Sequence, residues 1–97
     1  MQKQELYNHI LNLVSVETEI SITDILSCKK QSEIVDARSL FVYILNKNGF
    51  YVSYMSERMS RSTVGIRKLI AAFDNRKQQN KILKTNLEHI EKKLEIN

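Results

Sequence analysis

Apolar residues recur along most of this chain at spacings of three and four, which is the period of amphipathic helices. The first such stripe consists of Leu6, Ile10, Leu13 and Val14, widened by Tyr7 and Leu11. Residues at these spacings share one face of a helix, so they can all be buried together. The stripe therefore predicts a first helix over about residues 2–15.

A short second helix and a basic loop are predicted next. The apolar residues of that helix are Ile22, Ile25 and Leu26. Ser21 or Thr23 can cap its N-terminus, because either hydroxyl can accept a backbone N–H bond. The polar and basic residues that follow, over about 28–34, predict a loop in which Lys29 and Lys30 stand side by side.

A third helix is predicted from Asp36, which suits the N-cap position, to Lys47. Its buried residues would be Ala37, Leu40, Phe41, Ile44 and Leu45. Asn48 and Gly49 end this helix, since glycine adopts the left-handed C′ conformation without a Cβ clash. Ser53 can then cap a fourth helix.

Three further features complete the helical pattern. The fourth helix carries Met55 and Met59, and a fifth helix begins near Ser62 and ends near Asn75. A final amphipathic helix over about 78–95 carries Leu83, Leu87, Ile90 and Leu94. The chain has no proline and only two glycines, as expected for long helices with few tight turns. We therefore expect all 97 residues to form one all-α domain, a compact bundle of five to six helices.

Two registers compete in the fifth helix. If Val64 were buried, the next inward positions would be Arg67 and Lys68, which would place two charges in a small core. If Ile66 is buried instead, the residues three, four and seven positions later are all apolar. These residues are Leu69, Ile70 and Phe73. The period therefore favours Ile66 as the inward residue.

This register gives the fourth and fifth helices the pattern of a helix-turn-helix over about 53–76. Met59 and Ile66 are seven residues apart, and the small Ser56 lies where the two helices would cross. The opposite face of the fifth helix would then be basic and polar, as a recognition helix requires, with Gly65 allowing a close approach to the groove. The residues that we expect to contact DNA from this part of the chain are Arg61, Ser62, Thr63, Val64, Arg67 and Lys68.

Composition and charge narrow the function classes. The net charge of +4 suits a polyanionic partner, and the apolar fraction of 42% is that of a folded domain. No run of about 18 apolar residues exists, and polar residues interrupt the N-terminal segment where a signal peptide would be apolar. We expect no membrane partner and a location in the cytoplasm, on the bacterial nucleoid.

Catalytic and metal chemistry have no candidate residues. The single cysteine, Cys28, excludes an intramolecular disulfide and a thiolate cluster for zinc. His9 and His89 are far apart and belong to no metal-binding or nucleophile-activating motif. No carboxylates are paired for acid–base work. We therefore expect a protein that is not an enzyme, with no cofactor, no metal and no small-molecule substrate.

The segment from Ile22 to Lys30, I-T-D-I-L-S-C-K-K, resembles V-A-D-L-L-S-K-R-R in the C-terminal domain of the bacterial replication initiator DnaA. Further on, Ala37-Arg38-Ser39, followed by an apolar helix, resembles the family's P-R-Q. The resemblance covers about residues 7–94 and implies a helix-turn-helix domain similar to the Trp repressor. In the family, the loop and the arginine after the proline bear on DNA. The resemblance therefore implies DNA contacts for Lys29, Lys30 and Arg38.

The family signature G-x-R-D-H-T-T-V falls on residues 60–66 if one residue is dropped, with its arginine on Arg61 and its valine on Ile66. This placement agrees with the register favoured by the period. The aspartate, histidine and threonines of the family are replaced here by Ser62, Thr63, Val64 and Gly65, so the family's base preference is not implied. No G-x-x-x-x-G-K-[ST] motif occurs, so ATP binding is not implied either.

What the resemblance implies is double-stranded DNA binding in replication initiation or its regulation, without ATPase activity. A transcriptional regulator, or a helical interaction module of a mobile element, is the alternative. The final helix could join a replication protein or a second copy of the chain in a coiled coil. It offers fewer than three heptads, so we favour packing on its own domain.

Overall fold

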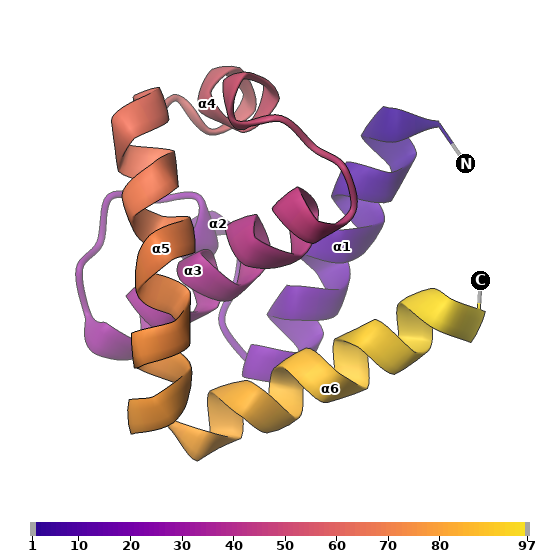
Figure 1. Cartoon of the computed structure of the whole chain (residues 1–97), viewed down its shortest axis with the longest axis vertical. Coiled ribbons are helices and arrows are strands. Elements are labelled where there is room, and N and C mark those ends of the chain that lie inside the picture. Colours follow the sequence, from indigo (N-terminus) through magenta and orange to yellow (C-terminus); the bar gives the residue numbers. More distant parts are fainter. Residues whose placement is uncertain (1, 97) are drawn as a thin grey trace.

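The structure is a computed structural model that describes residues 2–96 (Figure 1). Over this range the chain forms six helices and no strand, which confirms the all-α prediction. The helices are α1 (Lys3–Thr18), α2 (Ile22–Ile25), α3 (Ser32–Lys47), α4 (Val52–Met59), α5 (Thr63–Gln79) and α6 (Lys81–Ile96). Across residues 2–96, no helix combines the length and apolar character needed to cross a membrane.

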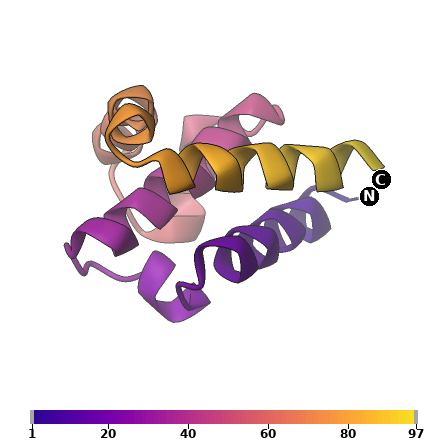
Figure 2. The same ribbon diagram turned by 90° about the horizontal axis from the view of Figure 1, so that it is seen from below.

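The central element is α3, which packs against α5, α1, α2 and α6. In Figure 1, α5 lies to the left of α3 and α1 lies to its right, while α4 sits above and leads into α5. Figure 2 shows α6 running alongside α1, and Figure 1 places α6 at the bottom of the view and α4 at the top. The middle of α3, from Ile34 to Leu45, is therefore largely covered by other helices.

The core follows the apolar stripes of the sequence and centres on α3. That helix supplies the largest share of fully covered side chains, among them Leu40, Phe41, Ile44 and Leu45. Aromatic rings tie the layers together. Tyr7 of α1 meets Phe41 edge to face with ring centroids 5.3 Å apart, and Tyr43 stacks on Phe73 of α5 at 4.3 Å.

The ends of α1, α2 and α3 are set by local backbone chemistry. α1 runs to Thr18, beyond the predicted end, and stops where Glu19 takes the left-handed conformation with φ 60°. The N-cap of α2 is Ser21, whose hydroxyl accepts the N–H of Asp24 at 3.1 Å. α3 ends as predicted, because Gly49 takes φ 87°.

Two predicted N-caps were wrong. α3 begins at Ser32, so the basic loop is shorter than predicted and Asp36 lies inside the helix, where its side chain is buried. α4 begins at Val52, with Tyr51 at its N-cap and Ser53 already in the first turn. Neither helix has a side-chain cap, and a local rule based on capping residues fails for that reason.

The boundary between the last two helices lies later than predicted. α5 extends to Gln79, and α6 begins at Lys81 rather than near residue 78. The side chain of Asn80 separates them, because its Oδ1 accepts the N–H of Ile82 at 3.1 Å. The polar stretch from residue 74 to residue 79 has no apolar stripe, so periodicity could not show that it is helical.

The apolar stripe of α6 is used inside the domain. Leu83, Leu87 and Ile90 are buried, and Leu94 is half-buried against the same core. α6 packs on α1, α5 and α3. This stripe is therefore not open for a coiled coil, in agreement with the favoured interpretation of the sequence.

Candidate nucleic-acid interface

The connection between α4 and α5 is a short, well-bonded turn. Ser60 ends α4 in the left-handed conformation with φ 52°, which reverses the chain direction. The N–H of Arg61 donates to the carbonyl of Ser56 at 3.1 Å, and the Ser56 hydroxyl donates to the Arg61 carbonyl. Ser62 then caps α5 by accepting the N–H of Gly65 at 3.0 Å. The two bonds between Ser56 and Arg61 thus hold the turn, and Ser62 fixes where α5 begins.

The register of α5 is the one favoured by the period. Ile66 and Phe73 are completely covered, whereas the side chain of Val64 is 56% exposed. Leu69 and Ile70 are half-buried against the core. The predicted partner of Ile66 across the turn, Met59, is also buried, and α4 packs on α5. The inward face of α5 is therefore apolar from Ile66 to Phe73.

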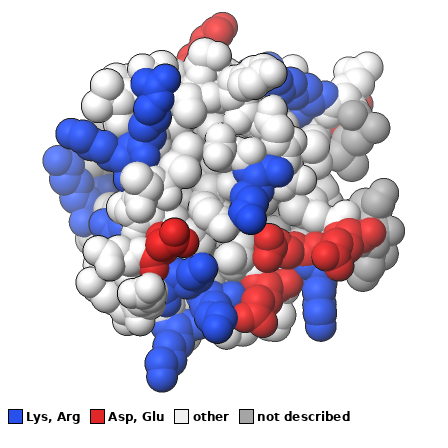
Figure 3. All heavy atoms as spheres, viewed as in Figure 1, with Lys and Arg blue, Asp and Glu red and all other residues white. Residues whose placement is uncertain are grey.

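The outward face of the first half of α5 is basic. Arg67 and Lys68 are exposed, and neither forms an ion pair within the described part of the chain. The first acidic residue on this helix is Asp74. Figure 3 shows Lys and Arg side chains gathered along the upper left edge of the molecule, where Figure 1 places this half of α5, and acidic side chains over α6. The first half of α5 thus offers a polyanion two exposed cations and no acidic side chain of its own.

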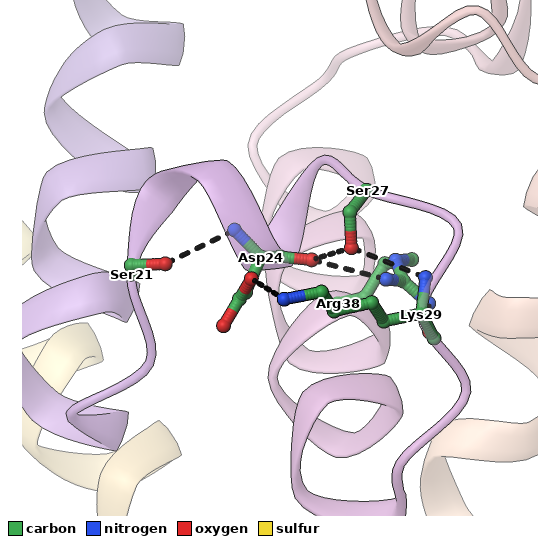
Figure 4. A network of polar contacts seen from close by, with 5 residues as sticks. All are labelled: Ser21, Asp24, Ser27, Lys29 and Arg38. Carbon is green, nitrogen blue, oxygen red and sulfur yellow. Dashed lines mark hydrogen bonds and ion pairs between the residues drawn. The ribbon is translucent and has the colours of Figure 1, made fainter.

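Arg38 occupies a structural position. It is only 3% exposed, and its guanidinium donates to three backbone carbonyls that end α2 and shape the basic loop. Its Nε bonds the oxygen of Ile25 at 2.8 Å, its Nη1 that of Lys29 at 3.0 Å and its Nη2 that of Asp24 at 3.1 Å. Figure 4 shows the side chain reaching from α3 into the curve of this segment. Burial, and then the nearby Arg61, lower the pKa of the Arg38 guanidinium.

The two loop lysines differ in their surroundings. Lys29 forms an ion pair with Asp24 at 2.8 Å, although its side chain is still about half exposed. Lys30 is exposed and forms no ion pair within residues 2–96. Because ion pairing neutralises part of the Lys29 charge, Lys30 is the more available cation of the pair.

Arg61 joins the loop to the turn. Its Nη2 donates to the carbonyl of Ser27 at 2.6 Å, across 34 positions in the chain. Together with Arg38, it places the basic loop beside the start of α5. The sequence predicted both segments as sites of contact, and the structure brings them onto one side of the molecule.

Several residues that position this surface were not predicted. The Ser39 hydroxyl, fully buried on α3, donates to the carbonyl of Leu69 on α5 at 2.7 Å. Asp36 accepts from Arg76 at 2.7 Å and from the side chain of Asn80 at 3.1 Å. These partners are 30 to 44 residues apart in the chain, and nothing in the local sequence marks them.

The remaining polar groups offer no metal site within residues 2–96, where no cluster of three or more histidine, cysteine or acidic side chains has a suitable arrangement. His89 lies 3.3 Å from a carboxylate oxygen of Glu17, which links α6 to α1.

Comparison of the chain with models of known families, with curated proteins and with solved structures finds no match.

Proposed function

We propose that this chain binds double-stranded DNA, with α4 and α5 acting as a helix-turn-helix and the first half of α5 lying in the major groove. The observation that carries the proposal is the uncompensated basic face of α5, opposite a fully buried Ile66. The major groove admits one α-helix, and phosphates on both of its rims attract cations. A helix with cations on its outer face and a rigid inner attachment suits that groove.

The side chains of this face divide into two kinds of contact. Arg67 and Lys68 are long enough to reach phosphates or guanine edges from an exposed helix face. Val64 presents an apolar surface at the start of the helix, which suits a thymine methyl group. Ser62 and Thr63, at the N-terminus of α5, offer hydroxyls to a phosphate where the helix dipole favours an anion.

The basic loop extends this surface along the DNA backbone. Lys30, with Lys29 beside it, would meet phosphates next to the groove that α5 enters. In this proposal Arg38 holds the loop in shape rather than contacting DNA, because it is only 3% exposed and donates to three backbone carbonyls. Loop and helix then act as one rigid unit.

The biological role that we propose is replication initiation or its regulation, without ATPase activity. Its support is the resemblance of the second helix and the basic loop to the C-terminal domain of DnaA. Regulation of transcription on a mobile element is the other role that this binding mode would serve. The site enriched from a random duplex pool, once it is located in the genome that encodes this chain, distinguishes the two roles, because clustered repeats in a replication origin and single promoter sites differ in arrangement.

Salt dependence of duplex binding tests the proposal directly. Fluorescence anisotropy with a random-sequence duplex should show log K falling linearly with log salt concentration, with a slope of about −0.9 for each phosphate contacted. The double variant Arg67→Ala/Lys68→Ala should make the slope less negative by about 2 and weaken binding at least tenfold at low salt.

The matched control is Lys84→Ala/Lys92→Ala, which removes two exposed cations from α6, a helix outside the proposed groove contacts. It should change neither slope nor affinity beyond a small net-charge effect. Salt-independent binding, or equal losses in the α5 variant and the α6 variant, would contradict the proposal.

After selection from random duplexes, Val64→Ala should alter one base preference by about 1 kcal/mol.

A further inference from the structure

A hollow of about 540 Å³ lies between the basic loop, α3, the turn before α5 and the part of α5 from Leu69 to Arg76. Its lining combines four cationic side chains with two apolar ones and a cysteine. These residues are Lys30, Arg38, Arg61, Arg76, Val35, Leu69 and Cys28. We call this space the loop hollow. Its volume lies within the range of roughly 300–1,000 Å³ that is usual for small-molecule sites.

Three of the four cations in the loop hollow have no acidic partner. Arg76 is neutralised by Asp36, whose carboxylate lies 2.7 Å away. Arg38 and Arg61 donate only to neutral backbone carbonyls, and Lys30 forms no ion pair within residues 2–96. The lowered pKa of Arg38, caused by burial and then by Arg61, fits this crowding of positive charge. An anion in the hollow would relieve it.

The two arginines are also held in place with donors to spare. A guanidinium carries five N–H donors, of which Arg38 uses one at each of three nitrogens and Arg61 uses one at Nη2. Each side chain is fixed by its existing bonds, so little further side-chain entropy is lost when an anion binds. The hollow therefore presents preorganised donors of the kind that recognise phosphate.

The depth of these charges selects among phosphates. Arg38 is 3% exposed, so an anion must enter the hollow to reach it. A phosphodiester carries one charge and is flanked by sugars on both sides, whereas a terminal phosphate carries nearly two charges and has three free oxygens. The apolar side chains of Val35 and Leu69 would pack against the uncharged part of a small ligand.

We propose that the loop hollow binds the terminal phosphate of a small phosphate monoester, such as a mononucleotide. Because Lys30 belongs to both the hollow and the proposed DNA surface, the bound ligand lowers the affinity for DNA. This second effect rests on the proposed function, whereas binding of the ligand does not. By linkage, DNA lowers the affinity for the ligand by the same factor.

Isothermal titration of the full chain with adenosine 5′-monophosphate, without DNA and at constant ionic strength, tests the site. Binding is expected for adenosine monophosphate, weaker binding for inorganic phosphate, and none for adenosine. Arg61→Gln should weaken binding about tenfold or more, since it removes charge-assisted hydrogen bonds. The side chain of Lys30 forms no hydrogen bond or ion pair with the rest of residues 2–96. Lys30→Gln should therefore weaken binding about threefold without changing the fold.

Two control variants keep the test specific. Lys92→Gln makes the same change in net charge and should leave the titration unchanged. Arg67→Gln should weaken DNA binding but not the binding of adenosine monophosphate, because Arg67 does not line the hollow. Equal binding by Arg61→Gln, Lys30→Gln and the original chain would overturn the site, as would no binding or equal binding of adenosine.

The DNA arm separates this proposal from the proposed function. Adenosine monophosphate should raise the apparent Kd for a duplex at fixed ionic strength, and adenosine should not. If the chain binds DNA with the expected salt slope but does not bind the monoester, the loop hollow is not a site for small phosphate monoesters. In that case this inference is wrong and the proposed function stands. If the monoester binds but DNA does not, the proposed function fails alone.

Discussion

Both halves of α5 carry basic residues, but within residues 2–96 only those of the second half have acidic partners. In the first half, Arg67 and Lys68 face outward without acidic partners. In the second half, Arg76 pairs with Asp36 of α3 at 2.7 Å, and Lys77 pairs with Asp74 at 3.6 Å. A cation on this helix is therefore either available to a partner or paired within the structure, according to whether a carboxylate lies beside it on α5 or on a neighbouring helix.

The difference follows from the geometry of the bundle. The second half of α5 is tied to the start of α6 and to α3 through the side chains of Asp36, Arg76 and Asn80. The first half is anchored from beneath by buried Ile66 and by the bond from Ser39 to Leu69, which leaves its outer face free of other helices. The second half of α5 thus attaches the helix to α3 and α6, and the first half leaves its outer face exposed.

The largest expected effect concerns the inward face of the first half. Ile66→Ala should lower the free energy of unfolding by about 3 kcal/mol, because it removes a fully buried side chain and leaves a cavity. Val64→Ala, two residues earlier on the exposed face, should change it by less than about 0.5 kcal/mol. Urea denaturation followed by circular dichroism measures both. Similar losses for the two variants would mean that the register is wrong.

A smaller effect is expected in the second half. Asp36→Asn should lower the free energy of unfolding by about 2 kcal/mol, since Arg76 then loses its counter-charge in a largely covered place. Asp74→Asn removes the carboxylate of an exposed pair and should cost at most about 0.5 kcal/mol. Denaturation at two salt concentrations tests this, because the exposed pair should be screened and the covered pair should not. Equal costs would remove the distinction between the two pairs.

The smallest effect concerns the turn that leads into the first half. Ser60 holds the left-handed conformation, which disfavours any side chain with a Cβ, so Ser60→Gly should raise the free energy of unfolding by up to about 1 kcal/mol. Glu19→Gly, at the matching position after α1, provides the comparison, with a similar gain expected. Thermal unfolding measures both variants. A loss of stability in Ser60→Gly would show that its side chain contributes more than the backbone strain costs.

Much of the fold could be predicted because helical period is a local property. The stripes of the long helices, the end of α3 at Gly49 and the inward position of Ile66 all follow from residues within two turns of one another. The same holds for the start of α5 near Ser62. By contrast, the sequence offered Asp36 and Ser53 as helix caps, and in the structure neither is one.

The candidate surface was predictable only in part, for the same reason. Period alone placed Arg67, Lys68 and exposed Val64 on one face of α5. Similar guanidinium groups at positions 38, 61 and 76 have three different surroundings, which depend on residues from 9 to 40 positions away. No local pattern encodes those distances.

By itself the amino-acid sequence determined that the chain forms these helices and which face of each long helix turns inward, although not every helix end, because the apolar period depends on neighbours along the chain. Only the tertiary structure decided that Arg38 shapes the basic loop and that Asp36 anchors α5. It also decided that a hollow with three uncompensated cations lies between the basic loop, α3 and α5. Charges acquire their roles from the groups packed around them. Those groups come together only when the helices do.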